Sequence, residues 1–165
     1  MSPKTIMIGM LVFIASVAGI AFLLTAGQKP SPATATYSIR ESDRPKAEQD
    51  KTFVDLGTIK VSDVKVQDYT LTNSGTKALQ ILNVNSSCGC TAGQVIYKGE
   101  TSKEFSMHTQ SGFVTEIAPG DTAIVRLTYR PASMPVYGFV ERAVYVETND
   151  PANRKLTFSI KTKVE

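Results

Sequence analysis

The sequence is poor in the residues on which most catalytic and metal centres depend. Its 165 residues include no tryptophan, one histidine and two cysteines. Two cysteines are too few for a disulfide-rich scaffold or for a zinc site made of four cysteines. The charge is also modest, because 18 basic and 15 acidic residues give a formal net charge of +3. So small an excess does not favour nucleic acid, and we expect no nucleic-acid partner.

Catalytic motifs are scarce as well. The sequence has no Gly-x-Ser-x-Gly motif and no glycine-rich phosphate loop that ends in lysine. A hydrolytic triad would have to use His108, the single histidine. Asp55, Asp63 and Asp68 are spread over a turn and two predicted strands, where we expect solvated strand ends. The sequence therefore predicts no catalytic residues and a protein that is not an enzyme.

One long apolar run stands near the N-terminus. Residues 6–24 carry no charged side chain, and a helix of this length would span roughly 29 Å, close to the thickness of a hydrocarbon core. Ser16 is its one polar residue, and a serine can bond back to its own helix. We predict a cytoplasmic N-terminus at residues 1–5 and a transmembrane signal anchor at residues 6–26. A cleaved secretory peptide is the alternative, and the sequence leaves cleavage open.

Both alternatives export the rest of the chain. Lys4 precedes the apolar run, and Lys29 is the first cationic residue after it. The positive-inside rule then predicts a single-pass protein of the inner (cytoplasmic) membrane, with the N-terminus inside and the C-terminal domain periplasmic or extracytoplasmic. Residues 27–50 contain three prolines and few apolar residues, which predicts an extracytoplasmic linker.

Residues 51–165 have the alternating pattern of β-strands. Apolar and polar residues alternate with a period near two in the segments 53–59, 64–71, 79–84, 123–129, 139–146 and 156–160. Turn signals separate these segments. No helical stripe follows residue 50. The pattern predicts an all-β, antiparallel sandwich of about seven to nine strands. The residues expected to form structural turns are Gly75, Gly89, Pro119, Gly120, Asn149, Asp150 and Pro151.

Five short motifs occur in a fixed order along this region. They are Phe53-Val54-Asp55-Leu56-Gly57, Leu71-Thr72-Asn73-Ser74-Gly75, Ser87-Cys88-Gly89-Cys90-Thr91, Ile117-Ala118-Pro119-Gly120-Asp121 and Thr148-Asn149-Asp150-Pro151. In this order they resemble a bacterial family of exported domains of unknown function, whose hallmark is the Ser-Cys-Gly-Cys-Thr motif. That family resembles the immunoglobulin-like domains of the Hydin and major-sperm-protein class. The resemblance covers residues 53–164 and implies an immunoglobulin-like β-sandwich and export, but no reaction.

Residues 92–116 depart from the family pattern, in which the connection from the cysteine motif to the Pro-Gly turn is usually short. We predict an inserted loop or hairpin here, with residues 94–97 paired to residues 104–107. Inserted loops on a rigid scaffold often carry specific contacts. Phe113 and Phe139 are expected to complete the core. The partner-binding candidates are Tyr97, Phe105, Met107 and His108.

Cys88 and Cys90 permit three hypotheses. The first is a disulfide or a reversible thiol pair, because exported proteins meet oxidants. The ring that this bond closes would be small and would add little stability through loop entropy. The second is a copper(I) site in which Met107 and His108 complete the ligand set, since soft sulfur ligands suit that ion. Copper(I) is the one cofactor that the sequence suggests. The third is inert packing at the edge of the sandwich.

These observations predict a membrane-anchored, non-enzymatic exported interaction module, an accessory or scaffolding subunit of a membrane-associated complex. Its partners would be the membrane, through residues 6–26, and other proteins of the complex. Strand edges and the insertion would supply the contacts, because edges offer unpaired backbone groups. The alternative function is a copper(I)-binding or thiol-redox carrier that uses Cys88 and Cys90.

Overall fold

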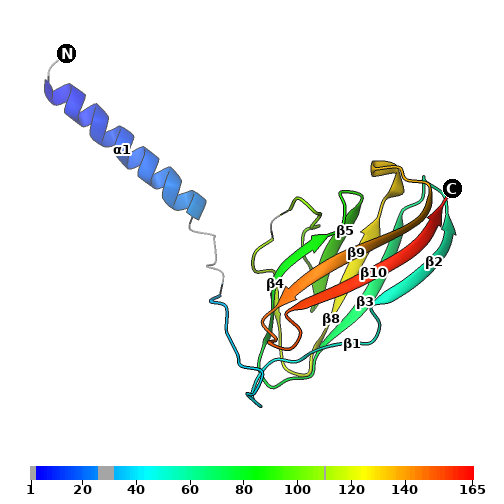
Figure 1. Cartoon of the computed structure of the whole chain (residues 1–165). Coiled ribbons are helices and arrows are strands. Elements are labelled where there is room, and N and C mark those ends of the chain that lie inside the picture. The colour runs from blue at the N-terminus through cyan, green and yellow to red at the C-terminus, as the bar shows by residue number, and fades with distance from the viewer. Residues whose placement is uncertain (1–2, 26–31, 110) are drawn as a thin grey trace. The chain divides into compact units, whose positions relative to one another are not determined.

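The computed structural model describes residues 3–25, 32–109 and 111–165, except for the side chains of residues 4–6, 24 and 25. The chain divides into two compact units, of which the first ends at Pro32 and the second runs from Ala33 to Glu165 (Figure 1). Residue 26, the last of the predicted anchor, and residues 27–31, the first of the predicted linker, lie outside the described residues.

The N-terminal unit contains one helix, α1 (Pro3–Thr25). The side chains from Met7 to Leu23 are exposed. The hydroxyl of Ser16 donates a hydrogen bond of 2.8 Å to the carbonyl oxygen of Phe13, so its polar group is satisfied within the helix. Within the part of the chain that the structure describes, no helix is both long enough and apolar enough to cross a membrane.

The second unit is a β-sandwich of two five-stranded sheets. In spatial order the first sheet contains β1 (Ala47–Gln49), β3 (Lys65–Asn73), β8 (Thr122–Tyr129), β5 (Thr91–Tyr97) and β6 (Glu100–Thr101). The second contains β2 (Phe53–Ile59), β10 (Lys155–Val164), β9 (Gly138–Thr148), β4 (Leu79–Ser86) and β7 (Thr115–Ile117). A short 3₁₀ helix, η1 (Pro131–Ser133), follows β8. The predicted all-β class is confirmed, with ten strands in the described residues where seven to nine were expected.

The sandwich is not wholly antiparallel, which corrects the prediction. β2 pairs in parallel with β10, with Phe53 opposite Ser159 and Ile59 opposite Val164. The reason lies in the chain's path. β1 belongs to the first sheet, and the chain then crosses between Gln49 and Phe53 to the far edge of the second sheet. The direction in which β2 leaves that crossing matches the direction of β10.

The core lies between the two sheets and follows the alternation that the sequence shows. Tyr69 of β3 and Phe158 of β10 are almost fully buried, with ring centroids 5.2 Å apart. The Tyr69 hydroxyl donates a hydrogen bond of 2.6 Å to the carbonyl oxygen of Ser159. Burial raises the pKa of Tyr69 to about 12, so the hydroxyl stays a donor at all physiological pH values. This pair therefore joins the two sheets by packing and by a hydrogen bond.

The domain begins earlier than the sequence suggested. Residues 33–50 were expected to be linker, yet Pro45 and Ala47 are buried against the sandwich. The backbone amide of Ala35 donates to the side-chain oxygen of Gln80 at 2.9 Å. Arg44 forms an ion pair of 2.6 Å with the buried carboxylate of Asp150. Polar side chains of the domain thus bind this proline-containing segment by its backbone, so its low hydrophobicity did not reveal the contact.

The insertion is a hairpin, but it is shorter than predicted. β5 pairs along its length with β8, so residues 91–97 belong to the sandwich itself. The hairpin turns at Lys98 and Gly99, both with positive φ, and pairs Tyr97 with Glu100. No strand forms at residues 104–107 in the described structure, where Phe105 makes a single bridge to Gly93. Phe105 is only 3% exposed, which corrects its assignment to a partner-binding surface.

Two of the predicted turn glycines differ in what they require. Neither Gly75 nor Gly89 has a positive φ, whereas Gly120 has a φ of +79°. A Cβ at Gly75 would overlap the carbonyl oxygen of Arg44 and the carbonyl carbon of Pro45. A Cβ at Gly89 would meet only Met134 Sδ, at an ordinary distance of 3.5 Å. Gly75 is therefore needed for the close approach of residues 44–46, and Gly89 is not needed for space.

This difference predicts a matched pair of results. Gly75→Ala should lower the free energy of unfolding by about 1–3 kcal/mol, because backbone atoms must move to admit the methyl group. Gly89→Ala should leave the free energy of unfolding nearly unchanged. Urea denaturation followed by circular dichroism measures both. Equal stability of the two variants would contradict the packing of residues 44–46 against Gly75.

Candidate functional site

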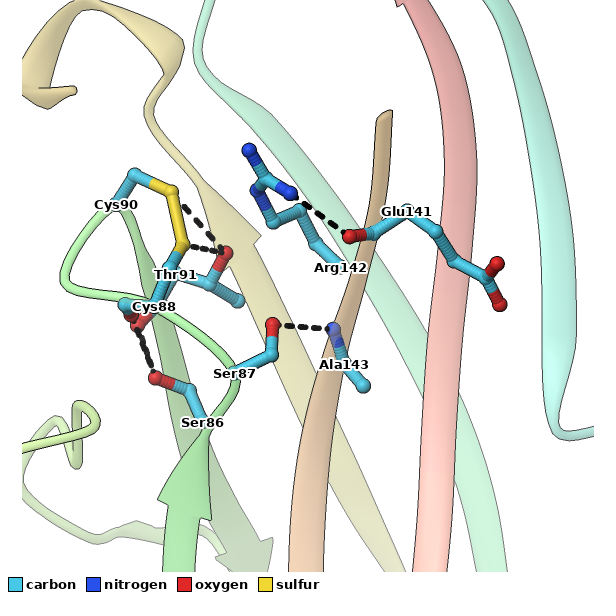
Figure 2. Close-up of a disulfide and its surroundings, with 8 residues drawn as sticks. All are labelled: Ser86, Ser87, Cys88, Cys90, Thr91, Glu141, Arg142 and Ala143. Atoms are coloured by element: carbon cyan, nitrogen blue, oxygen red, sulfur yellow. Dashed lines mark hydrogen bonds between the residues drawn. A yellow bond between two sulfur atoms is a disulfide. The ribbon is translucent and has the colours of Figure 1, made fainter. Parts of the chain in front are cut away.

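Residues 86–91, called here the cysteine loop, connect β4 in the second sheet to β5 in the first (Figure 2). The Ser86 hydroxyl lies 2.9 Å from the carbonyl oxygen of Cys88 and 2.7 Å from that of Thr91. The backbone amide of Thr91 donates to the carbonyl oxygen of Cys88 at 3.2 Å. The serine and threonine that flank the cysteines thus close the loop by local hydrogen bonds.

Further hydrogen bonds hold the cysteine loop to its neighbours. The backbone amide of Ser87 donates to the carbonyl oxygen of Ala143 on β9, and the amide of Ala143 donates to the Ser87 hydroxyl at 3.0 Å. The amide of Arg130, just after β8, donates to the carbonyl oxygen of Cys90 at 2.8 Å. The conformation of the loop therefore has support from both sheets that does not depend on its sulfur atoms.

The sulfur atoms of Cys88 and Cys90 are bonded to each other, with the Cα atoms 5.3 Å apart. Cys90 is 3% exposed, Cys88 is half-buried and Gly89 is exposed. The bond closes a loop of only three residues. In the chain-entropy model such a loop gains roughly 1.6 kcal/mol, well below the 2–4 kcal/mol that is typical of disulfides. Together with the hydrogen bonds above, this small gain makes a purely stabilising role a weak explanation of the pair.

Thr91 is the polar residue in contact with both sulfur atoms. Its hydroxyl oxygen lies 3.3 Å from Cys88 Sγ and 3.9 Å from Cys90 Sγ, and the residue is 1% exposed (Figure 2). Thr91 begins β5 and pairs with Tyr129 of β8, which fixes the position of its backbone. The hydroxyl is thus placed to donate a hydrogen bond to sulfur.

A positive charge lies on the interior face of the same end of the sandwich. Arg142 is half-buried and lies in the same phase of β9 as the buried residues Val140 and Val144, and its Nη1 donates a hydrogen bond of 2.9 Å to the carbonyl oxygen of Glu141. Its guanidinium carbon lies 5.6 Å from the centroid of the Tyr129 ring. Among the described residues, the buried Nε of Arg142 and the buried hydroxyl of Tyr129 have no hydrogen-bond partner. This end of the core is therefore unusually polar for an interior.

The structure does not assemble the ligand set of the copper(I) hypothesis. Met107 and His108 line a surface hollow with Asn83 and Asn85 of β4. The cysteines lie beyond the end of β4, where the nearest thioether to the Gly89 position is that of Met134. Among the residues described, no group of three or more His, Cys, Asp or Glu is arranged to hold a metal ion.

The hydroxyl of Tyr97 is hydrogen-bonded within the domain. Its hydroxyl donates a hydrogen bond of 2.6 Å to Asp121 Oδ2 and accepts one of 3.1 Å from the backbone amide of Ala118. The Tyr97 hydroxyl and then the Lys98 ammonium lower the pKa of Asp121 below its usual value. Tyr97 thus fixes the Pro-Gly turn to β5. Of the four partner-binding candidates, Met107 and His108 are exposed.

The partner-binding candidates predicted from the sequence did not include four exposed apolar residues near the start of β9. We call them the apolar tip and define it as Met134, Val136, Tyr137 and Phe139. The exposed fractions of Tyr137 and Phe139 are 66% and 75%. Phe139 was expected in the core and this is wrong, because Val140, Val144 and Val146 occupy the buried phase of β9 and leave Phe139 in the opposite phase. The alternation of apolar and polar residues along residues 139–146 already indicated which face of β9 is buried.

The apolar tip and the cysteine loop share one end of the sandwich. β9 begins here, opposite the end of β10 at Val164, and Met134 lies beside Gly89. Val64 and Val66, at the start of β3, are exposed at the same end, since Lys65 pairs with Tyr129. Residues 33–46 contact the opposite end, near Asp150 (Figure 1).

Comparisons with known proteins give a family and a fold. Residues 47–164 match the model of the family "Protein of unknown function (DUF1573)". A protein of unknown function from Porphyromonas gingivalis W83 has a similar structure, with a TM-score of 0.58 and 16% identity over 76% of this chain and 50% of that one. A family 123 glycoside hydrolase from Clostridium perfringens has a TM-score of 0.51 and 9% identity, over 68% of this chain and 22% of that one. An ASH/PapD-like domain of human CEP192 has a TM-score of 0.47 and 14% identity, over 84% of this chain and 98% of that one.

These similarities concern the fold alone. The chain spans half of the length of the Porphyromonas gingivalis protein and about a fifth of the glycoside hydrolase. The search of curated proteins found no match. No activity is therefore transferred from these relatives, and function has to be argued from the surface of the chain itself.

Proposed function

Because the chain belongs to the DUF1573 family of unknown function, we propose from its surface that it is a non-enzymatic interaction module, exported and held at the membrane by its N-terminal segment. Its role would be that of an accessory or scaffolding subunit in a membrane-associated complex. The apolar tip is the observation that carries this proposal.

The apolar tip has the composition of the centre of a protein interface. Its four large apolar side chains fall within residues 134–139 and are roughly half exposed or more. Aromatic and methionine side chains are enriched at the centres of interfaces, where charged residues are depleted. The tip is made of such side chains, and it is bordered by charge, because Lys163 of β10 pairs with Phe139 and the ammonium of Lys161 lies 5.4 Å from the centroid of the Phe139 ring. A partner that covers the tip would remove this apolar surface from water.

A second contact surface is the outer edge of β3. β1 pairs with only Leu71, Thr72 and Asn73. In the described structure, residues 65–70 of β3 have a neighbouring strand on one side only, which is β8. Such an edge accepts a strand from another protein through backbone hydrogen bonds. It begins at the same end of the sandwich as the apolar tip, so one partner can contact both.

The membrane anchor is proposed on the sequence of α1. Residues 6–24 carry no charged side chain, and the described side chains of the helix are apolar and exposed, except for the internally bonded Ser16. A lipid environment would cover those side chains. Residues 33–46 contact the end of the domain opposite to the apolar tip, so the chain enters the domain at the end away from the tip.

The Hydin and major-sperm-protein class remains part of the proposal. Its support is the order of the five motifs in a sandwich in which Asn73 and Asp150, from two of them, are buried hydrogen-bonded residues.

The test is co-purification of the tagged full-length chain from its native membrane in mild detergent, with quantitative mass spectrometry. With the double variant Tyr137→Ser/Phe139→Ser, the amount of the larger proteins that co-purify with the wild type should fall at least tenfold. Ile39→Ser is the matched control, because Ile39 is equally exposed at the opposite end of the domain. Partners that are retained by the double variant, or a wild-type protein that elutes alone, would contradict the proposal.

A further inference from the structure

The cysteine loop has features of a chemical site that the proposed interaction module does not need. Its disulfide closes only three residues, and its conformation is fixed by hydrogen bonds from Ser86, Ser87 and Thr91. The two sulfur atoms therefore stay close together whether or not they are bonded. A pair held in this way can open and close without a change of fold, and that is what reversible thiol chemistry requires.

The two cysteines differ in exposure. Cys88 is half-buried, and Cys90 is 3% exposed. Gly89 between them is exposed and has no side chain to cover the bond. An external thiolate must reach a sulfur directly opposite the bond that breaks, so access decides which sulfur is attacked. Access favours attack at Cys88 and makes Cys90 the leaving group.

The Thr91 hydroxyl can stabilise Cys90 as the leaving group. Its hydroxyl lies 3.9 Å from Cys90 Sγ and 3.3 Å from Cys88 Sγ, in an almost fully buried position. A hydroxyl donor stabilises a thiolate when the bond opens, and a buried donor does so more strongly than water-exposed ones. The same hydroxyl serves either sulfur, so it assists both opening and closing of the bond.

We propose that Cys88–Cys90 is a thiol–disulfide exchange site that reacts with a dithiol of another exported protein. A thiolate of that partner attacks Cys88 Sγ. The Cys88–Cys90 bond breaks, its electron pair goes to Cys90 Sγ, and a mixed disulfide joins the partner to Cys88. The second thiolate of the partner then attacks the partner's own sulfur in this mixed disulfide, and Cys88 leaves as a thiolate. In sum the partner dithiol becomes a disulfide, and Cys88 and Cys90 gain two electrons and two protons.

The site is independent of the apolar tip in its chemistry. The double variant Cys88→Ser/Cys90→Ser should therefore keep the proteins that co-purify through the tip. Loss of those proteins from Tyr137→Ser/Phe139→Ser, with exchange unchanged, would likewise separate the two proposals.

The first experiment treats the full-length chain in mild detergent with dithiothreitol. The disulfide should be reduced while the far-ultraviolet circular dichroism stays unchanged, because hydrogen bonds hold the loop. Reduction that occurs only after urea unfolds the domain would overturn the proposal, as would unfolding caused by reduction alone.

The second experiment tests the roles of the two sulfur atoms with oxidised glutathione as the probe. Cys90→Ser, which leaves Cys88 free, should form the glutathione mixed disulfide at least tenfold faster than Cys88→Ser, as followed by intact mass. Equal rates would overturn the assignment of Cys88 as the attacked sulfur.

The role of Thr91 has its own readout. Thr91→Val removes the hydroxyl but keeps the shape, and it should slow reduction of the wild-type disulfide by glutathione about tenfold. Thr91→Ser restores a hydroxyl and should recover most of the rate. If both variants react as the wild type does, Thr91 only packs against the sulfur atoms.

Discussion

Asp150→Ala is expected to lower the free energy of unfolding by about 3–5 kcal/mol, because it removes one partner of a buried ion pair. The carboxylate of Asp150 is fully buried and lies 2.6 Å from the guanidinium of Arg44. It also accepts hydrogen bonds of 3.0 Å from the backbone amides of Ala47 and Ala152 and from the side chain of Asn153. The bonds from Arg44 and Ala47 attach residues 44–47 to the sandwich, so their loss should also release β1.

Urea unfolding measures this change, and limited proteolysis within residues 33–50 detects the release of β1. Asp43→Ala is the matched control, because Asp43 also pairs with a cation, Lys77, but its side chain is 61% exposed. The control should change stability little, since solvent screens exposed ion pairs. If Asp150→Ala is as stable as Asp43→Ala, the buried pair does not secure the N-terminal segment.

The same carboxylate predicts a pH dependence. Burial on its own raises the pKa of Asp150, but the amides of Ala47 and Ala152, then Asn153 and Arg44, lower the pKa by more. A carboxyl group with a lowered pKa in the folded state stabilises that state above its unfolded pKa of about 3.9 and loses this contribution as the pH falls through the folded value. The stability difference between the wild type and Asp150→Asn should therefore be constant above about pH 5 and shrink below about pH 4.

Phe158→Ala is expected to lower the free energy of unfolding by about 3–5 kcal/mol. Phe158 is fully buried at the centre of β10, and its ring packs against that of Tyr69 in the opposite sheet. Alanine would leave a cavity between the sheets. The backbone hydrogen bonds within each sheet hold the strands in place, so the cavity cannot close by a movement of the strands.

Phe53→Ala provides the control for this prediction, because Phe53 is also on a strand of the second sheet but is 49% exposed. Phe53→Ala should lower the free energy of unfolding much less than Phe158→Ala does. Urea unfolding at neutral pH measures the free energy of unfolding of both variants. Equal costs would mean that the packing between Tyr69 and Phe158 does not determine the stability of the sandwich.

The strands were predictable because local physics determines them. The alternation at residues 156–160 buries one face of that segment, and turn residues such as Pro119 and Gly120 separate strands earlier in the chain. The parallel pairing of β2 with β10 was not predictable in this way. It depends on a crossing between the sheets, and no residue between Gln49 and Phe53 has a pattern that specifies the direction of the next strand.

The candidate site was predictable only in part. The sequence singled out Cys88 and Cys90, but it placed Met107 and His108 near them, and the loop that carries these two residues lies beside β4 instead. The hydrogen bonds of Ser86 and Thr91 depend on the return of the chain from β4 into β5, which periodicity does not reveal. Likewise, the polar segment before residue 50 gave no sign of the contact between Arg44 and Asp150, which joins positions more than 100 residues apart.

The exposure of Phe139 in the apolar tip depends on which alternate residues of β9 face the core. Phe139 and Val140 are adjacent, and only one of them faces the core. Residues 135–137, which precede β9, belong to no strand or helix, and Met134, Val136 and Tyr137 are exposed as well. A shift of the β9 register by one residue would bury Phe139, the most exposed residue of the apolar tip.

Site-specific photo-crosslinking tests the central proposal most directly. A photoreactive amino acid replaces Tyr137 in the apolar tip of the full-length chain, in its native membrane, and a matched chain carries it at Ile39, at the opposite end of the domain. The account predicts a discrete protein adduct from position 137 and none from position 39. Absence of an adduct at position 137, or the same adducts from both positions, would contradict a partner bound at the apolar tip.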